Sequence, residues 1–260
     1  MDPFLNIAIK AARKAGDLIT RAVVQQTRLQ VSEKGLNNLV TQIDQAAEAA
    51  MIETLLQAYP DHGILAEESG KSGNLQSQQI WIIDPLDGTA NFIRGLPQYT
   101  VSIALQTQGR LSHAVVYHPF TQDLYVAIKG QGAQLNDHRM RVSPDPTMAG
   151  MLFSAGIPHQ KANIHQINAV IQFMQDEHCN LRRSGTTALD LAYVGTGALQ
   201  AFWGMDVQPW DVAAGALIVR EAGGMVMDLW GGEDYLYGGT IFASTPKLIK
   251  QILPRIRLEK

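Results

Sequence analysis

Two aspartates three residues apart, in the segment WIIDPLDGTANF at residues 81–92, are the strongest chemical feature of the sequence. The apolar residues before Asp84 predict a buried strand. Pro85 predicts a turn after it, because proline cannot continue the hydrogen-bond ladder of a strand. Asp84, the main-chain carbonyl of Leu86 and Asp87 could then converge on one point. Three oxygen donors of this kind suit a hard cation.

Gly88 and Thr89 directly follow this pair. Their N–H groups could begin the next segment, a position in which phosphate is favoured by hydrogen bonding and by electrostatics. A metal ion and a phosphate group would then lie side by side. Taken alone, an Asp-x-x-Asp pair is more typical of a turn or a helix cap, so the other acids of the chain decide between the two interpretations.

Four further acids also lie where predicted strands end or helices begin, which is where chains deliver functional groups. They are Glu67 and Glu68 after the strand GILA, Asp211 ahead of a long apolar helix, and Asp44 at another helix start. Simpler explanations exist: the two glutamates could end an exposed strand, where only one can face a site, and the aspartates could be N-caps. Carboxylates without histidine or cysteine favour Mg²⁺ or Mn²⁺, and two such ions could activate water and stabilise a leaving oxygen.

Helical and strand periodicities occur in both halves of the chain and predict a layered α/β (α+β) fold. We expect one compact unit with two lobes, residues 1–145 and 146–260, because prolines and a glycine interrupt the pattern in VSPDPTMAG. The polar segment 32–44 is predicted as a loop. The predicted helices are 6–24, 46–59, 164–177, 188–194, 212–222 and 246–255, and the predicted strands are 63–66, 80–83, 101–105, 114–117, 124–128, 151–154, 225–228 and 240–243.

The composition argues against several classes of protein. The chain has 260 residues with 46% hydrophobic and 17% charged residues, which is typical of a globular protein. A net charge of −3 offers no positive field for nucleic acid. A single cysteine, Cys179, forms no intrachain disulfide or zinc cluster. Lys10, Arg13 and Lys14 interrupt the first apolar stretch, so we expect a cytoplasmic protein without a membrane span.

Several motifs, in their order and spacing, resemble the signature of the inositol monophosphatase family: NLVTQID, ILAEES, WIIDPLDGTANF and PWDVAAGALIVREAGG. The strings NIAIKAARKAG, GQGAQLN and RRSGTTALDLAYVGTG resemble the bacterial SuhB branch, so the resemblance covers essentially the whole chain. It implies a layered αβαβα sandwich of the sugar phosphatase superfamily. It also implies a Mg²⁺-dependent, lithium-sensitive enzyme that is commonly a homodimer.

The resemblance also assigns roles to single residues. It implies that two or three Mg²⁺ ions, with Mn²⁺ as an alternative, are held by Glu67, Asp84, the Leu86 carbonyl, Asp87 and Asp211, with Glu68 in support. Catalysis would rest on Thr89 and Asp44, which with the ion on Glu67 orient the attacking water. Substrate contacts are implied for Asp87, Gly88, Thr89, Gly185, Thr186, Thr187 and Asp211.

One position departs from the family pattern. Many members carry a glutamate seven residues before the last aspartate, where it binds ring hydroxyls, and this chain has Gly204 there. Asp206 is a candidate substitute. Loss of this carboxylate would weaken selectivity for inositol without touching the metal ligands. Myo-inositol 1-phosphate is the expected substrate, with fructose 1,6-bisphosphate, other sugar or glycerol phosphates and adenosine 3′,5′-bisphosphate as alternatives.

A function from another class also follows from the SuhB resemblance, because some members of that branch act with the transcription machinery in ribosomal RNA antitermination. The fold would then serve as a scaffold for a protein partner, with or without enzymatic activity. Candidate contacts are Arg182, Arg183, Arg255, Arg257 and Lys260, although such charges more often belong to an ordinary solvated surface. Trp203, Met205 and Trp210 indicate either an interface patch or ordinary core packing. An inactive metal-binding member is a third alternative.

Overall fold

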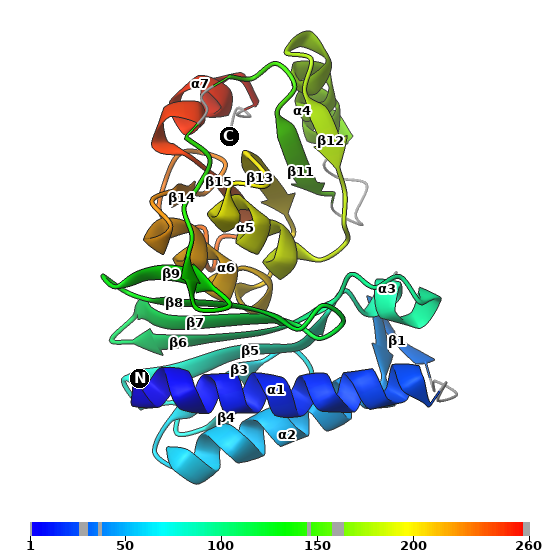
Figure 1. Cartoon of the computed structure of the whole chain (residues 1–260), viewed down its shortest axis with the longest axis vertical. Coiled ribbons are helices and arrows are strands. Elements are labelled where there is room, and N and C mark those ends of the chain that lie inside the picture. The colour runs from blue at the N-terminus through cyan, green and yellow to red at the C-terminus, as the bar shows by residue number, and fades with distance from the viewer. Residues whose placement is uncertain (1, 26–30, 36–37, 145–146, 158–163, 257–260) are drawn as a thin grey trace.

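The fold is seen in a computed structural model, which describes residues 2–25, 31–35, 38–144, 147–157 and 164–256. Its helices and strands form five layers in which two sheets alternate with helices (Figure 1). The predicted αβαβα arrangement is therefore confirmed. The helical layers are α1 (Pro3–Val24) with α2 (Gln42–Ala58), then α5 (Thr187–Thr196) with α6 (Pro209–Glu221), and finally α4 (Ile164–Asp176) with α7 (Pro246–Ile256).

The first helix, α1, has small residues on the face that it buries. Five of the eight buried residues are alanines and one is Gly16, so α1 can approach its neighbours closely. A Cβ atom at Gly16 would lie only 2.5 Å from the Tyr117 ring, which shows how tightly α1 packs on the sheet. On the outside, Lys14 Nζ donates to Glu53 Oε2 of α2 at 2.6 Å.

The larger sheet has the strand order β10-β9-β8-β7-β6-β5-β3-β4. Neighbours are antiparallel except β3 and β5, which run parallel. Because parallel strands end at the same edge, the residues after β3 lie beside the end of β5. Its strands are β3 (Gly63–Ala66), β4 (Gly70–Gly73), β5 (Gln79–Asp87), β6 (Thr100–Thr107), β7 (Arg110–His118), β8 (Asp123–Ile128), β9 (Gly132–Leu135) and β10 (His138–Arg139).

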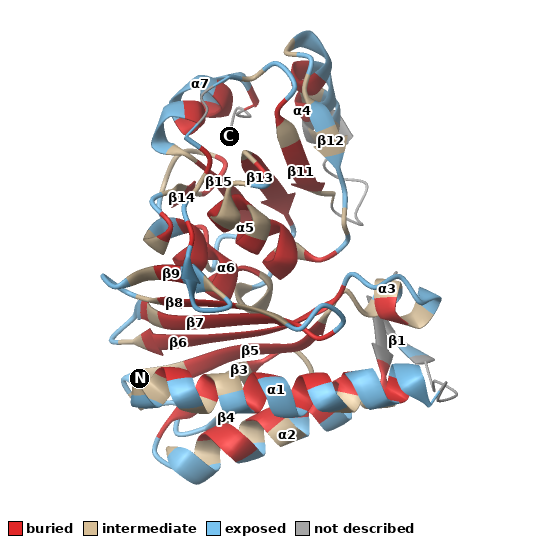
Figure 2. Cartoon of the chain, viewed as in Figure 1, coloured by how far each residue is buried: buried red, intermediate tan, exposed pale blue. Residues whose placement is uncertain are grey.

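Between the two sheets, α6 is enclosed by protein. Every residue from Val212 to Val219 is buried (Figure 2), as expected for a helix that is apolar on all sides. The second sheet has the order β12-β11-β13-β15-β14 and is covered on its outer face by α4 and α7. Its strands are β11 (Leu152–Gly156), β12 (Asn180–Arg182), β13 (Ala201–Met205), β14 (Met225–Met227) and β15 (Thr240–Ser244).

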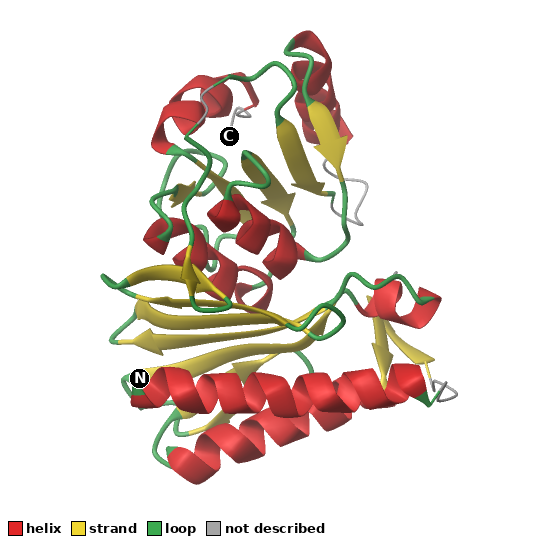
Figure 3. Ribbon diagram, viewed as in Figure 1, coloured by secondary structure: helices red, strands yellow, loops and turns green. Residues whose placement is uncertain are grey.

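The predicted loop over residues 32–44 is wrong in its secondary structure. The structure has an antiparallel pair there, β1 (Val31–Gly35) and β2 (Asn38–Thr41), after which α2 begins (Figure 3). Asparagine and glycine around the turn made this pair look irregular, although they are common hairpin residues. The short strands β4, β9, β10, β12 and β13 were also missed. The lobe boundary near residue 145 stays a prediction, since residues 145 and 146 lie outside the described ranges.

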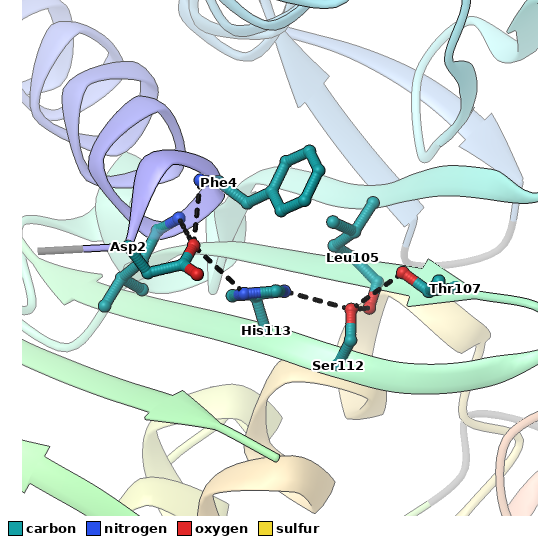
Figure 4. A network of polar contacts seen from close by, with 7 residues as sticks. Asp2, Phe4, Leu105, Thr107, Ser112 and His113 are labelled. Atoms are coloured by element: carbon teal, nitrogen blue, oxygen red, sulfur yellow. Dashed lines mark hydrogen bonds and ion pairs between the residues drawn. The ribbon is translucent and has the colours of Figure 1, made fainter. Parts of the chain in front are cut away.

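The N-terminus of α1 is tied to the sheet by a polar network (Figure 4). Asp2 Oδ1 accepts the N–H groups of Phe4 and Leu5 at 2.9 and 3.1 Å, and His113 Nε2 lies 3.1 Å from the same oxygen. Burial raises the pKa of Asp2, but these N–H groups and His113 outweigh it and hold the pKa below its ordinary value. The cap therefore joins the helix to β7.

Candidate active site

The end of β5 forms the centre of the site. Asp84 pairs with Ser102 of β6 and Asp87 pairs with Thr100, so β5 contains one extra residue in a bulge. The strand therefore continues to Asp87, whereas the sequence analysis predicted that it would end in a turn at Pro85. Because the hydrogen-bond ladder is interrupted at a bulge, proline is tolerated there although it has no N–H to donate.

Four carboxyl groups gather around this bulge, from Glu67 after β3, Asp84 and Asp87 of β5, and Asp211 of α6. Asp84 is buried and shares a hydrogen bond with Glu67. Burial, followed by the charge of Glu67 and of the other two acids, raises the pKa of Asp84 well above its ordinary value. Burial and Asp211 do the same for the pKa of Asp87. Burial raises the pKa of Asp211 to about 6.

This cluster fits a divalent cation, because every donor is a hard oxygen and the negative charges repel one another without one. In the part of the chain that the structure describes, no group of three or more His, Cys, Asp or Glu side chains is already arranged so that it could hold a metal ion. Glu67 and Asp84 instead share a hydrogen bond. A cation bound by both side chains would replace the proton of this hydrogen bond.

Next to the cluster, Thr89 and Asp44 form a hydrogen-bonded pair. Thr89 Oγ1 donates to Asp44 Oδ1 at 2.8 Å and also lies 3.0 Å from the Leu86 carbonyl oxygen. The other oxygen of Asp44 accepts the N–H and the hydroxyl of Thr41, which completes a capping box. Asp44 is therefore the third residue of α2 and not its N-cap, which is Thr41. Its carboxylate contacts both this N-cap residue and Thr89.

The N-termini of α5 and α6 point their N–H groups at the acids. Asp87 Oδ2 accepts the N–H of Ala188 at 2.7 Å, and Asp211 Oδ2 accepts the N–H of Gln208 at 2.7 Å. Asp211 is thus the third residue of α6 and forms a capping box with the N-cap residue Gln208, so it is not the N-cap that the sequence analysis suggested. Both helix N-termini favour negative charge nearby, which suits a site for phosphate as well as for carboxylates.

The loop before α5 is held against the short helix α3 (Thr89–Arg94) by one side chain that the sequence analysis missed. Asn91 Nδ2 donates to the carbonyl oxygens of Gln98 and Ser184, both at 2.8 Å. Thr186 is buried, and its hydroxyl also donates to the Gln98 carbonyl at 2.8 Å. Asn91 lies inside the motif DGTANF, so its position next to the acids was the available signal.

Gly88 allows this loop to come close. It has φ of +96°, and a Cβ atom there would lie 2.6 Å from Thr186 Oγ1 and 2.8 Å from the Gln98 carbonyl oxygen. No other residue type fits both the conformation and the space. The backbone of Gly88 and Thr89 is therefore held between the acid cluster and the loop at residues 184–187.

A cavity of about 210 Å³ opens beside Asp211. Its lining includes Gly185, Thr187 and Asp206 as well as the apolar residues Phe202 and Val207. Asp206 is exposed and has φ of +56°. It therefore lines the cavity next to the position where the sequence analysis expected a hydroxyl-binding carboxylate.

At that position, Gly204 is packed beneath side chains. A Cβ atom there would meet Phe202 at 3.0 Å, Val207 at 3.1 Å and Ile241 at 3.2 Å. A Cβ atom at this position would therefore be tightly packed, and Asp206 is the carboxylate that lines the cavity from this strand end.

The candidate partner-binding residues are placed differently from one another. Arg182 and Arg183 are exposed, and Arg183 also lines the 210 Å³ cavity. Arg255 forms an ion pair with Glu177 at 2.5 Å, and two further candidates, 257 and 260, lie outside the described residues. Trp203 and Met205 are buried in the core of the second sheet, which favours the packing interpretation for these two.

Comparison with known proteins places the chain in a family. Residues 1–259, which are nearly the whole chain, match the inositol monophosphatase family.

The chain belongs to the inositol monophosphatase family.

Two groups of relatives stand out within the family. The chain is 44% identical over 260 residues to the Nus factor SuhB of Escherichia coli K12, covering all of this chain and 97% of that protein. The crystal structure of the extragenic suppressor protein suhB from Bartonella henselae matches with a TM-score of 0.95 and 38% identity over 100% of both chains. The inositol monophosphatase from Anabaena (Nostoc) sp. PCC 7120 matches with a TM-score of 0.83 and 32% identity, over 97% and 94% of the two chains.

None of the helices in the described ranges is both long enough and apolar enough to cross a membrane.

Proposed function

We propose that this family member is a Mg²⁺-dependent phosphomonoesterase that hydrolyses myo-inositol 1-phosphate to inositol and phosphate. The observation that carries the proposal is the group of four carboxyls around the β5 bulge, next to the hydrogen-bonded pair of Thr89 and Asp44. The carboxyl cluster does not serve to stabilise the fold, since repulsion between buried acids opposes folding.

Two or three Mg²⁺ ions, or Mn²⁺ in their place, would be held by the donors at the end of β5 and by their two neighbours. These are Glu67, Asp84, the Leu86 carbonyl, Asp87 and Asp211, with Glu68 in support. When bound, such ions lower the pKa of a coordinated water and neutralise charge on the leaving oxygen. The proposed ligands come from three places: the turn after β3, the end of β5 and the first turn of α6.

Thr89 and Asp44 are proposed to orient and deprotonate the attacking water, beside Glu67. The hydroxyl proton of Thr89 is directed at Asp44 Oδ1 over 2.8 Å. The lone pairs of Oγ1 therefore remain to accept a hydrogen bond from water, and the carboxylate receives the proton at the end of this chain. The second oxygen of Asp44 is fixed by Thr41, so the carboxylate cannot turn away.

The substrate is proposed to lie between the acid cluster and the 210 Å³ cavity. The backbone of Gly88 and Thr89 and the N-termini of α5 and α6 would bind the phosphate, together with Asp87 and Asp211 through their metal ions. The loop of Gly185, Thr186 and Thr187 would border the ring. Asp206 is the carboxylate available for ring hydroxyls, because Gly204 provides none.

The test is Mg²⁺-dependent phosphate release from four substrates: myo-inositol 1-phosphate, fructose 1,6-bisphosphate, glycerol 2-phosphate and adenosine 3′,5′-bisphosphate. We expect release from the inositol ester that is lost in Asp84→Asn and retained in Asp17→Asn, a matched change on the exposed face of α1. Release from another ester only would keep the chemistry and change the substrate. Release from none would refute the enzymatic proposal.

A second function is proposed on the 44% identity with the Nus factor SuhB of E. coli. In that role the chain binds a protein of the transcription machinery, and the exposed Arg182 and Arg183 are the proposed contacts. The two functions separate in a binding assay with transcription complexes. Arg183→Ala is expected to lose binding and Asp84→Asn to retain it. The proposal fails if Arg183→Ala retains binding or if the chain does not bind. Light scattering of the purified protein tests the proposed homodimer.

A further inference from the structure

The buried acid Glu48 lies outside the carboxylate cluster and has no role in the proposed reaction. It is only 3% exposed and lies on α2 one helical turn after Asp44. Residues four apart in a helix share one face, so α2 presents two buried carboxylates toward the active-site edge of the sheet. A buried carboxylate is retained only when it is well hydrogen-bonded.

The partners of Glu48 are two consecutive backbone N–H groups. Its Oε2 accepts the N–H of Glu68 and its Oε1 accepts the N–H of Ser69, both at 2.8 Å. Both oxygens are thus used, one for each donor. Hydrogen bonds to a charged acceptor are stronger than those between neutral groups.

These two donors belong to the turn that presents Glu67. Ala66 of β3 pairs directly with Gly70 of β4, so only three residues make the turn between the strands. The N–H of Glu67 donates to the Ile83 carbonyl at 3.3 Å. Glu48 holds the other two N–H groups, and with it every backbone N–H of the turn is bound.

We propose that Glu48 is a positioning residue, which fixes the β3–β4 turn so that the carboxyl of Glu67 faces Asp84. The inference rests on the proposed metal site and adds a residue that holds one of its ligands. On this view α2 places both parts of the reaction centre. Asp44 fixes Thr89, and Glu48, four residues after Asp44 on the same helix, fixes Glu67.

Glu48→Gln tests this role with little change in size, because one acceptor oxygen becomes an NH₂ group that faces a backbone N–H. The matched control is Glu53→Gln, the same substitution on the exposed side of the same helix. Partners that orient metal ligands typically contribute 10-fold to 100-fold in metal affinity. We therefore expect Glu48→Gln to weaken Mn²⁺ binding by roughly 10-fold to 100-fold, and Glu53→Gln to leave it unchanged.

Mn²⁺ binding is measured from the electron paramagnetic resonance signal of the free ion, at a temperature where circular dichroism shows each variant folded. The Mg²⁺ concentration that gives half-maximal activity should rise in Glu48→Gln more than kcat falls. Glu48→Asp keeps both acceptor oxygens and should recover part of the affinity, and it replaces Glu48→Gln if that variant does not fold.

Mn²⁺ affinity equal to that of Glu53→Gln would overturn the inference and leave Glu48 a purely structural residue. The same holds if Glu48→Gln lowers only the melting temperature. A wild-type chain that binds no Mn²⁺, with Asp84→Asn indistinguishable from it, is a different result. It refutes the metal site itself, and the role of Glu48 falls with it.

Discussion

Replacing Asp211 by asparagine is expected to stabilise the metal-free protein while removing its response to Mg²⁺. Burial raises the pKa of Asp211 to about 6 from an ordinary value near 3.8, which corresponds to about 3 kcal/mol at pH values where the group is ionised. A carboxyl with a raised pKa binds more protons in the folded state than in the unfolded state. The free energy of unfolding therefore falls as the pH rises from about 4 to about 6. Above that range the loss of stability caused by the ionised Asp211 stays constant.

The asparagine in Asp211→Asn does not ionise and still offers an oxygen to the N–H of Gln208, so most of this loss of stability disappears. At pH 8 without metal we expect the variant to melt about 5 °C higher, since a domain of this size shifts by roughly 2 °C per kcal/mol. Near pH 4 the two proteins should melt together. Mg²⁺ should raise the melting temperature of the wild type and leave that of the variant nearly unchanged.

The assay is thermal unfolding followed by circular dichroism between pH 4 and 8, with and without Mg²⁺. Asp17→Asn, on the exposed face of α1, serves as the control and should follow the wild type throughout. A metal-free variant that is less stable than the wild type at pH 8 would refute the reasoning about charge. An equal Mg²⁺ response in both proteins would refute the role of Asp211 as a ligand.

Three further predictions concern the neighbours of the cluster and the helix cap. Thr89→Val removes the hydroxyl that donates to Asp44; kcat should fall by about 10²-fold or more, with Mn²⁺ binding retained, as steady-state kinetics and metal titration will show. Asn91→Leu removes two hydrogen bonds, to the carbonyls of Gln98 and Ser184, through which this side chain holds the substrate loop in place. These are together about 2 kcal/mol, so kcat/KM should fall roughly 30-fold. Asp2→Asn should lower the free energy of unfolding by at most about 1 kcal/mol at pH 7. Because the pKa of Asp2 is lowered in the fold, melting curves should show this difference vanish as the pH falls below about 4.

Local pattern was sufficient for most of the helices and the longer strands, because their apolar periodicity is decided within a few residues. The hairpin β1–β2 and the short strands were missed, since a strand of two to five residues without alternation is recognised only by its partner. The continuation of β5 past Pro85 has the same origin. The bulge depends on the pairing of Asp84 and Asp87 with β6, which the sequence does not state.

The site residues that the sequence missed are those whose partners are distant or belong to the backbone. Asn91 binds a carbonyl 93 residues away, and Glu48 binds N–H groups 20 and 21 residues away. Main-chain groups are the same for every residue type, so no motif marks them. Asp44 illustrates the converse: the sequence suggested a helix cap or a site residue, and in the structure one carboxylate oxygen binds Thr41 in the capping box while the other binds Thr89.

The central claim is that the four carboxyls around the β5 bulge bind divalent cations. Its most direct test is the anomalous scattering of Mn²⁺ in crystals grown with the ion and with inorganic phosphate. The account predicts at least two Mn²⁺ peaks within bonding distance of Glu67, Asp84, Asp87 and Asp211, with phosphate near Gly88 and Thr89. Crystals in which these acids keep their hydrogen bonds and Mn²⁺ lies elsewhere or is absent would contradict it.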